Sequence, residues 1–234
     1  MGKLEKIISD IRRPPSLPNW VRLNHRRRDD TMRSIAKFAL GKPRHALAQI
    51  YGLIADYITY RISPKEIEGG LQKITNPLVR RLGREIISTI LPWLDKQEIK
   101  GIEVFNNLSI PFPIGRGIVV PVKPTFVFQH EKKLTPVFVI GWASMPFTDF
   151  QKRLLGTVIY KAILTLEGFQ GSEAHIVCVP RYKGSKSERF IRDWKVSKPE
   201  LTDDELRDQF DRFGNALDDA VPVVLEELSR RGEL

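Results

Sequence analysis

Two stretches of the chain concentrate the side chains that bind phosphate. One begins after a proline-rich segment, residues 12–20, and the other lies between an apolar run and an acidic helix, residues 181–198. A guanidinium offers paired donors to phosphate oxygens, and an ammonium supplies a compact positive charge. We predict nucleic-acid contacts from ten residues in these stretches: Arg22, Arg26, Arg27, Arg28, Arg181, Lys183, Lys186, Arg189, Arg192 and Lys195.

The segment before the first stretch has three prolines within five positions, and the two together are predicted to be an extended basic arm. An alternative is a solvated arm that packs Leu17, Trp20 and Leu23 on the body of the protein. Aromatic residues between the cations could stack on unpaired bases, and the alternative for those of the second stretch is that they anchor it to the core. The aromatic residues concerned are Trp20, Tyr182, Phe190 and Trp194.

Residues for catalysis or metal binding are sparse. The chain has no P-loop, GxGxxG, HExxH or GxSxG motif, and its four histidines fall on different predicted elements. Cys178 lies in an apolar run, which favours a buried residue over a nucleophile. Asp203-Asp204 and Asp218-Asp219 lie on an acid-rich helix, where a solvated face is expected. We predict no catalytic residue, no metal site and no cofactor.

Charge is distributed unevenly along the 234 residues. The net charge is +10, but residues 199–234 hold eleven acidic against four basic residues, a local −7, so residues 1–198 carry +17. A strongly basic body suggests a polyanionic partner. No apolar run is long enough to span a membrane and no signal peptide is visible, so we expect a cytoplasmic protein without a membrane partner.

The chain divides into four predicted parts. Residues 1–30 form the basic arm, which starts with a short amphipathic helix, and residues 31–76 form a helical region. Asp29 or Asp30 is a plausible N-cap for its first helix, and Ser63 with Glu66 forms a capping box for a later one. Residues 77–180 form an α/β core, and residues 181–234 contain the basic loop and an acidic helix that begins with a capping box at Thr202.

The core is organised around a predicted hairpin. Its strands are residues 118–129 and 134–142, separated by the polar turn 130–133. The second strand is apolar on both faces, which is typical of the middle of a covered sheet. A helix from Pro77 and a short strand around residues 102–105 precede the hairpin. A helix capped by Thr148 and Gln151 and a strand at 174–179 follow it. The helix between the last two strands predicts that they pair in parallel.

This order of elements resembles the core of the PD-(D/E)xK restriction-endonuclease-like superfamily over about residues 77–180. The resemblance implies an α/β (α+β) fold, with a mixed sheet flanked by helices, an N-terminal helical region and a C-terminal helix. It also implies an Asp near the start of the second core strand and a Glu-x-Lys on the third. Two carboxylates of that family hold Mg²⁺, and the lysine orients the attacking water.

The sequence departs from this catalytic pattern. Thr125 stands at the Asp position, and the third strand offers residues 140–143, Ile-Gly-Trp-Ala, without an acid or a lysine. Glu85 lies on the helix that carries a metal-ligand glutamate in some RecB-like members, but one carboxylate is not enough for Mg²⁺. We therefore expect a degenerate nuclease-like scaffold whose catalytic chemistry is lost.

Three functions follow. The first is a non-catalytic nucleic-acid-binding protein, with DNA preferred over RNA, in a regulatory or accessory role. The second is a protein–protein adaptor that uses the last helix, whose apolar spacing resembles a heptad seam. Four apolar residues form this seam: Leu206, Phe210, Phe213 and Leu217. They would either pair with a second copy to make a homodimer or dock the helix on the chain's own core. The third is an active Mg²⁺-dependent nuclease with migrated ligands, for which Glu85, Glu103 and Asp149 are the candidates.

Overall fold

The computed structural model describes residues 3–41, 47–97, 108–130, 133–145 and 147–233. The helices are α1 Lys3–Arg12, α2 Leu17–Leu23, α3 Arg28–Leu40, α4 Ala48–Tyr60, α5 Pro64–Gln72, α6 Pro77–Asp95, α7 Asp149–Ile159, the π-helix η1 Tyr160–Leu164 and α8 Asp203–Arg230. The strands are β1 Ile110–Pro113, β2 Val119–Val122, β3 Phe126–His130, β4 Lys133–Ile140, β5 Ala174–Cys178 and β6 Arg192–Val196. The predicted class, a mixed sheet flanked by helices, is confirmed.

The main sheet has the strand order β3-β4-β5-β6. The predicted hairpin is confirmed, because β3 and β4 pair antiparallel with Phe128 opposite Thr135. The predicted parallel pair is also confirmed, since Val137 of β4 lies opposite His175 of β5. β4 is the strand expected to be covered on both faces, and its residues 135–140 are all buried.

Two predicted elements, one strand and one loop, are wrong in detail. The run 118–129 is divided between two sheets, since β2 pairs with β1 in a separate two-stranded sheet while β3 joins the main one. Pro124 lies at the division, and a proline has no N–H to donate to a continuous ladder. Part of the basic stretch 181–198, predicted as a loop, forms β6 and pairs antiparallel with β5. The strand predicted around 102–105 lies outside the described residues.

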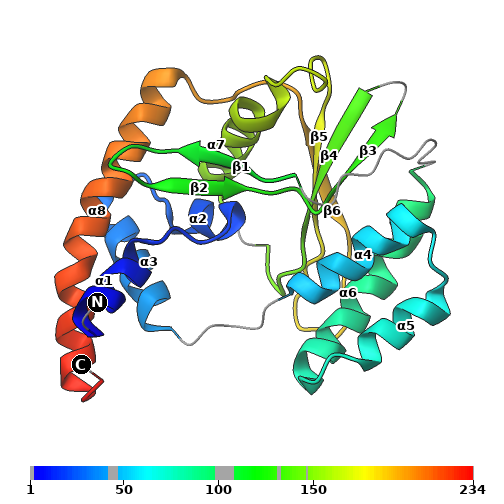
Figure 1. The fold of residues 1–234 in the computed structure, drawn as a ribbon, viewed down its shortest axis with the longest axis horizontal. Coiled ribbons are helices and arrows are strands. Elements are labelled where there is room, and N and C mark those ends of the chain that lie inside the picture. The colour runs from blue at the N-terminus through cyan, green and yellow to red at the C-terminus, as the bar shows by residue number, and fades with distance from the viewer. Residues whose placement is uncertain (1–2, 42–46, 98–107, 131–132, 146, 234) are drawn as a thin grey trace.

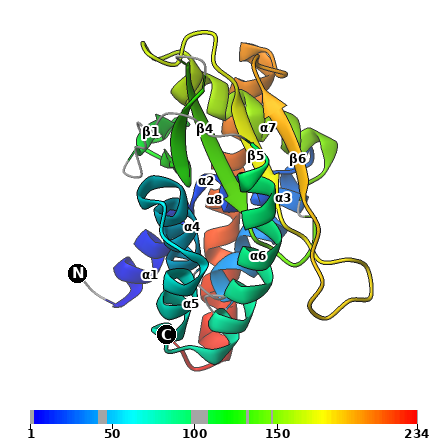
Figure 2. The ribbon, with the colours of Figure 1, turned by 90° about the vertical axis from the view of Figure 1, so that its right-hand side faces the viewer.

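The sheet is the middle of three layers. Helices α4, α5 and α6 cover one face, where Val137, Val139 and Val177 are buried (Figures 1 and 2). Helices α2, α3, α7 and α8 pack on the other side with the β1–β2 hairpin, over Phe138 and Ile140. None of the helices in the described ranges is both long and apolar enough to cross a membrane.

The predicted capping boxes are confirmed at all three places. Ser63, Thr148 and Thr202 each accept a hydrogen bond from the backbone N–H three residues later, and the glutamate or glutamine there bonds back. Asn76 caps α6, which begins at Pro77 as the sequence predicts. These local signals fix where four helices begin, including α7, which positions the candidate site described below.

The predicted extended arm is wrong over residues 17–23. These residues form α2, in which Pro18 lies in the first turn, where its missing N–H removes no helical hydrogen bond. Trp20 is fully buried, in agreement with the packing of Leu17, Trp20 and Leu23 that the alternative proposed. The predicted aspartate cap of α3 is also wrong, because its N-cap is Arg27 and Asp29 and Asp30 lie in its first turn.

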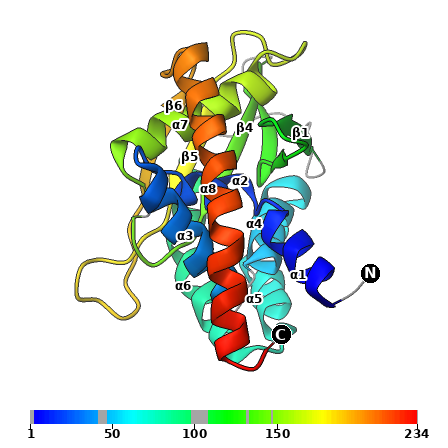
Figure 3. The same ribbon diagram turned by 90° about the vertical axis from the view of Figure 1, so that its left-hand side faces the viewer.

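Helix α8 lies along α3 and closes the second layer of helices (Figure 3). Leu206, Phe213 and Leu217 are buried in the chain's own core, and Phe210 packs against that core. Trp20 meets the rings of Phe210 and Phe213 at 6.1 and 5.6 Å between centroids. This burial agrees with the docked-helix interpretation of the four residues, and dimerisation itself stays a prediction.

Candidate nucleic-acid interface

Glu85 is the centre of a buried ionic cluster at the carboxyl ends of β4 and β5. It lies in the middle of α6, and its side chain is only 7% exposed. Both of its carboxylate oxygens accept hydrogen bonds from Arg181, at 2.7–3.0 Å. Arg189 Nε donates to Glu85 Oε2 at 3.1 Å. Two guanidinium groups therefore bond to the carboxylate of Glu85, which is one of the candidate Mg²⁺ ligands in the sequence.

Arg189 is also bonded to the strand ends. Its Nη1 donates to the carbonyl oxygens of Val179 at 2.6 Å and Gly141 at 3.1 Å, which lie just past β5 and β4. Burial lowers the pKa of Arg189, while the hydrogen bond to Glu85 opposes that shift. Its side chain has no exposed surface. Arg189 thus fastens the loop between β5 and β6, residues 181–190, to the sheet.

Four of the ten predicted phosphate contacts are placed differently from what was expected. Arg189 is buried, so the prediction that it contacts phosphate is wrong. Arg181 is one-fifth exposed, and its Nε and Nη2 atoms donate hydrogen bonds to Glu85. Arg28 makes a two-bond pair with Asp219 of α8, at 2.6 Å for each bond. Lys195 pairs with Glu173 at 3.1 Å, at the opposite end of the sheet.

The other predicted cations are exposed, and two of them lie over aromatic rings. The Arg22 guanidinium is 4.9 Å from the ring centroid of Trp142, in the segment that follows β4. The Arg26 guanidinium is 5.7 Å from the ring of Phe150, in the first turn of α7. A cation above a ring is attracted to it and keeps its hydrogen-bond donors at the rim. Arg27 is exposed and 4.0 Å from Asp30.

Buried amides hold this arginine segment in place. Gln151 Nε2 donates to the carbonyl oxygens of Arg22 at 3.0 Å and Asn24 at 2.8 Å. Gln209 of α8 donates to Asn24 Oδ1 at 2.8 Å. All three amides are almost fully buried, at 0–2% exposure. Because a buried carbonyl without a partner is costly, this network fixes the backbone that carries Arg22 and Arg26.

The remaining predicted cations extend the same edge. Arg192 begins β6 opposite Cys178 and makes no ion pair with the described residues. Lys183 and Lys186 are exposed in the loop 181–190, which projects from the sheet in Figure 2. The ring of Tyr182, 54% exposed, packs 4.8 Å from that of Phe190 at an angle of 34°.

Three contacts join these groups into one surface. Phe147 meets both Trp142 and Trp194, and Arg181 N–H donates to the Ala143 carbonyl at 2.9 Å. We name it the carboxyl-edge surface, because it surrounds the carboxyl ends of β4 and β5. Its members are Arg22, Arg26, Trp142, Tyr182, Lys183, Lys186 and Arg192.

The positions that carry carboxylates in the resembling family are used for structure. Thr125 Oγ1 accepts a hydrogen bond from the Val139 N–H at 2.9 Å. A Cβ at Gly141 would lie 2.6 Å from Cδ1 of Ile86, and its N–H donates to the buried hydroxyl of Tyr51. Asp149 is exposed and pairs with Lys152, while Glu103 lies outside the described residues. Within the described ranges, no three His, Cys, Asp or Glu residues gather as a metal would require.

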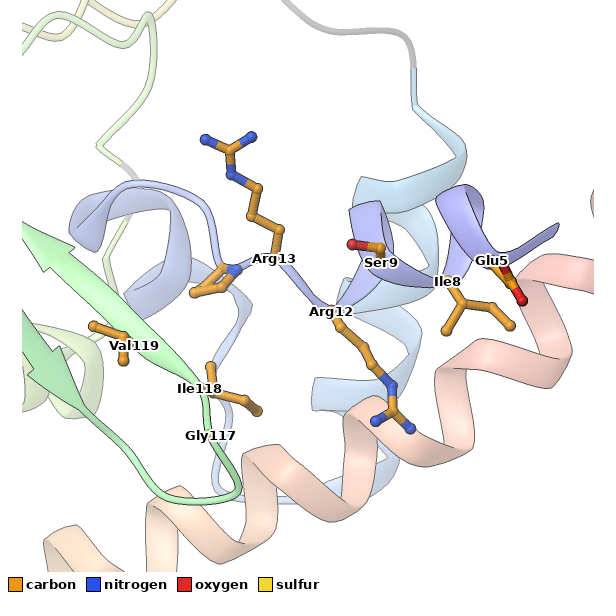
Figure 4. A pocket seen from close by; sticks show the side chains of 9 residues that line it. Glu5, Ile8, Ser9, Arg12, Arg13, Gly117, Ile118 and Val119 are labelled. Carbon is orange, nitrogen blue, oxygen red and sulfur yellow. The ribbon is translucent and has the colours of Figure 1, made fainter. Parts of the chain in front are cut away.

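A hollow of about 680 Å³ lies away from these groups, between α1 and the β1–β2 turn (Figure 4). Ile8, Ile118 and Val119 line it together with Arg12 and Arg13. Arg12 turns to α8, where it bonds to Asp218 at 3.1 Å, and Arg13 points away (Figure 4). This hollow brings together no set of groups that could perform catalysis.

Sequence reasoning did not find the supporting residues. The sequence pattern indicates Gln151 only as a helix cap, and it does not indicate the contacts of Asn24 and Gln209. A polar residue within the apolar stripe of a helix is the sequence signal that could indicate a buried polar contact. Gln209 of α8 and Glu85 of α6 both show this pattern. Which distant group each one meets depends on the tertiary fold.

Comparison with known proteins adds little. No family model matches this chain, and no curated protein matches it. Among solved structures, it is similar to a protein from Eubacterium rectale described as "Putative exonuclease", with a TM-score of 0.38 and 12% identity over 97% of this chain and 85% of the other. We draw nothing from a similarity of this size.

Proposed function

We propose that this protein binds nucleic acid, DNA in preference to RNA, through the carboxyl-edge surface. The observation that supports this most is the gathering of exposed cations beside exposed or half-buried rings on a backbone held by buried bonds. Cations bind phosphates of any sequence, and rings stack on unpaired bases. The role would be regulatory or accessory, since such contacts position a strand but carry no sequence information.

We propose further that the bound strand is not cut. Glu85, whose partner Arg189 bonds to the strand ends, has both oxygens committed to arginines. Gly141, on the strand that carries Glu-x-Lys in the resembling family, has no room for a side chain unless Ile86 moves. These observations support a degenerate nuclease-like scaffold of the PD-(D/E)xK type.

A salt-titrated anisotropy assay tests binding. Labelled single- and double-stranded DNA and RNA are titrated at several salt concentrations, and affinity should fall steeply as salt rises. A variant with Arg22, Arg26 and Arg192 all changed to Gln should bind more weakly. A matched control changes Lys65, Lys73 and Lys37, exposed lysines away from this surface, to Gln. No binding of any strand at about 50 mM salt would reject the proposal.

Incubation with supercoiled plasmid and Mg²⁺ or Mn²⁺ tests the second part. Intact plasmid is expected. Cleavage that disappears in Glu85→Gln while the variant stays folded would show that the carboxylate serves a reaction, and would overturn the non-catalytic role.

A further inference from the structure

A second polar site lies at the opposite end of the main sheet. A pocket of about 460 Å³ opens at the amino ends of β4 and β5. This volume is within the range of small-molecule sites. Eight of its lining residues carry polar or charged groups: Gln97, Lys133, Thr135, Ser172, Glu173, His175, Lys195 and Ser197. We call it the polar pocket.

The polar pocket continues a sheet face that is otherwise apolar. Side chains alternate along a strand, so Thr135 shares a face with Val137 and Val139, and His175 shares it with Val177. The valines are buried under α6. That helix ends at Asp95, and Gln97 just beyond it lines the pocket. Where helical cover stops, the same face changes from valine to threonine, lysine and histidine.

The register of the strands gathers these groups. Phe128 of β3 lies opposite Thr135 of β4, and His175 of β5 lies opposite Lys195 of β6. The rings of Phe128 and His175 meet edge to face at 6.2 Å. Four neighbouring strands thus each contribute one residue to the pocket floor, an arrangement that holds the groups at fixed spacing.

Ser172 supplies the observation that points to a ligand. It is 5% exposed, and its hydroxyl has no hydrogen-bond partner among the residues that the structure describes. A buried hydroxyl without a partner is rare and unfavourable, so a group that enters the pocket and bonds to it would gain from it.

The charged side chains around the pocket indicate whether that entering group is an anion or a cation. Lys195 is 3.1 Å from Glu173, so these two cancel. Lys133 makes no ion pair with the described residues, and its Nζ lies at the pocket wall, where a Cβ added to Gly171 would be 3.8 Å away. Among the described residues, Lys133, Lys195 and Glu173 therefore sum to a charge of +1 at the pocket.

We propose that the polar pocket binds the phosphate group of a small phosphate monoester. A phosphate has several acceptor oxygens, which suit the ammonium of Lys133 and the hydroxyls of Ser172 and Thr135 together. Phe128 and the sheet exclude water from one side. The proposal does not depend on nucleic-acid binding, because the pocket and the carboxyl-edge surface lie at opposite ends of β4.

Chemical shifts in ¹H–¹⁵N spectra of the full chain test the proposal, with inorganic phosphate and ribose 5-phosphate as probes. Sodium chloride at matched ionic strength and ribose are the controls. Saturable shifts confined to residues 133–135, 172–175 and 195, with a Kd of about 1 mM or tighter, are expected for both probes. Equal shifts at lysines all over the surface, or none, would overturn the proposal. A 5′-phosphorylated trinucleotide that binds here while ribose 5-phosphate does not would assign the site to strand ends and overturn the small-molecule proposal.

Two charge variants should change phosphate affinity in opposite directions, and misfolding would not produce that result. Lys133→Gln should weaken phosphate binding about tenfold, and Glu173→Gln should tighten it about threefold, since it frees Lys195. Ser172→Ala should weaken binding about tenfold and leave the melting temperature unchanged or higher, because its hydroxyl bonds to none of the described residues of the free protein. Lys37→Gln, an exposed lysine on α3 away from the polar pocket, is the matched control and should leave phosphate binding unchanged. Weaker binding in Glu173→Gln would contradict the proposal.

Discussion

Arg189 Nε lies 3.1 Å from Glu85 Oε2, although the two residues are 104 positions apart in the sequence. The arginine side chain is 0% exposed and the glutamate 7%. Arg181 adds a second guanidinium to the same carboxylate, so the cluster holds more positive than negative charge. The pair joins α6 to the β5–β6 loop and places the loop's exposed lysines at the sheet edge.

Glu85→Gln is expected to destabilise the protein by about 3–5 kcal/mol, because it leaves buried guanidinium charge without a counter-ion. The free energy of unfolding from urea denaturation measures the effect. Glu68→Gln is the matched control: Glu68 also pairs with an arginine, Arg84, but on an exposed surface, where little change is expected. Equal effects of the two substitutions would mean that the cluster does not hold the loop.

Gly141→Ala should destabilise the fold by about 1–3 kcal/mol, since the new Cβ would lie 2.6 Å from Ile86 Cδ1. Ile86→Val removes that methyl group. In a double-mutant cycle by urea denaturation, the two changes together should therefore cost less than their sum. Strict additivity would mean that contact with Ile86 is not what requires glycine at this position.

The sequence predicted the parts of the fold that depend on local signals. Capping boxes located α5, α7 and α8, and the apolar run in residues 134–142 indicated the covered strand. The sequence did not predict that the proline-rich stretch around Trp20 forms a buried helix. That burial depends on contacts of Trp20 with Phe210 and Phe213, nearly 200 residues later. Arg189 and Lys183 have the same charge and lie in the same loop, and only the position of Glu85 separates a structural cation from an exposed one.

Acidic residues of α8 show the same dependence on tertiary structure. The sequence predicts a solvated face for the paired acids Asp218-Asp219 of this helix. In the structure, Asp218 and Asp219 pair instead with Arg12 and Arg28 of the N-terminal segment. The pair with Arg28 lowers the pKa of Asp219, so its contribution to stability is present at neutral pH and is lost as the pH falls through that lowered pKa.

Gln151→Glu should destabilise the protein by about 1–3 kcal/mol, because an oxygen would replace the nitrogen that donates to the Arg22 and Asn24 carbonyls. The helix cap survives in this variant, since its other oxygen still accepts from the Thr148 N–H. Glu205→Gln, at the equivalent capping position of α8, is the control, and it should unfold in urea almost as the wild type does. If Gln151→Glu is as stable as the wild type, the buried amide network does not order the arginine segment.

Alkaline pH should destabilise the protein partly through Cys178. Burial raises the pKa of this thiol from 9.0 to about 12, with Lys152 and Arg192 opposing the shift. The unfolded chain loses the proton first, so this contribution is present below about pH 9 and is lost as the pH rises towards 12. Between pH 7 and 10, the wild type should lose about 1.4 kcal/mol more stability than Cys178→Ala. Parallel pH profiles of the two proteins would contradict this prediction.

The exposed lysines of the β5–β6 loop give the most direct test of the nucleic-acid interface. Changing Lys183 and Lys186 to Gln should remove two phosphate contacts and reduce the slope of log K against log salt on duplex DNA by about 1.8. The control changes Lys65 and Lys73, exposed lysines at the two ends of α5, and its slope should equal that of the wild type. If Glu85→Gln stays folded, it should weaken nucleic-acid binding even though the loop keeps both lysines. An unchanged slope in the Lys183 and Lys186 variant would remove the loop from the interface and leave the surface around Trp142.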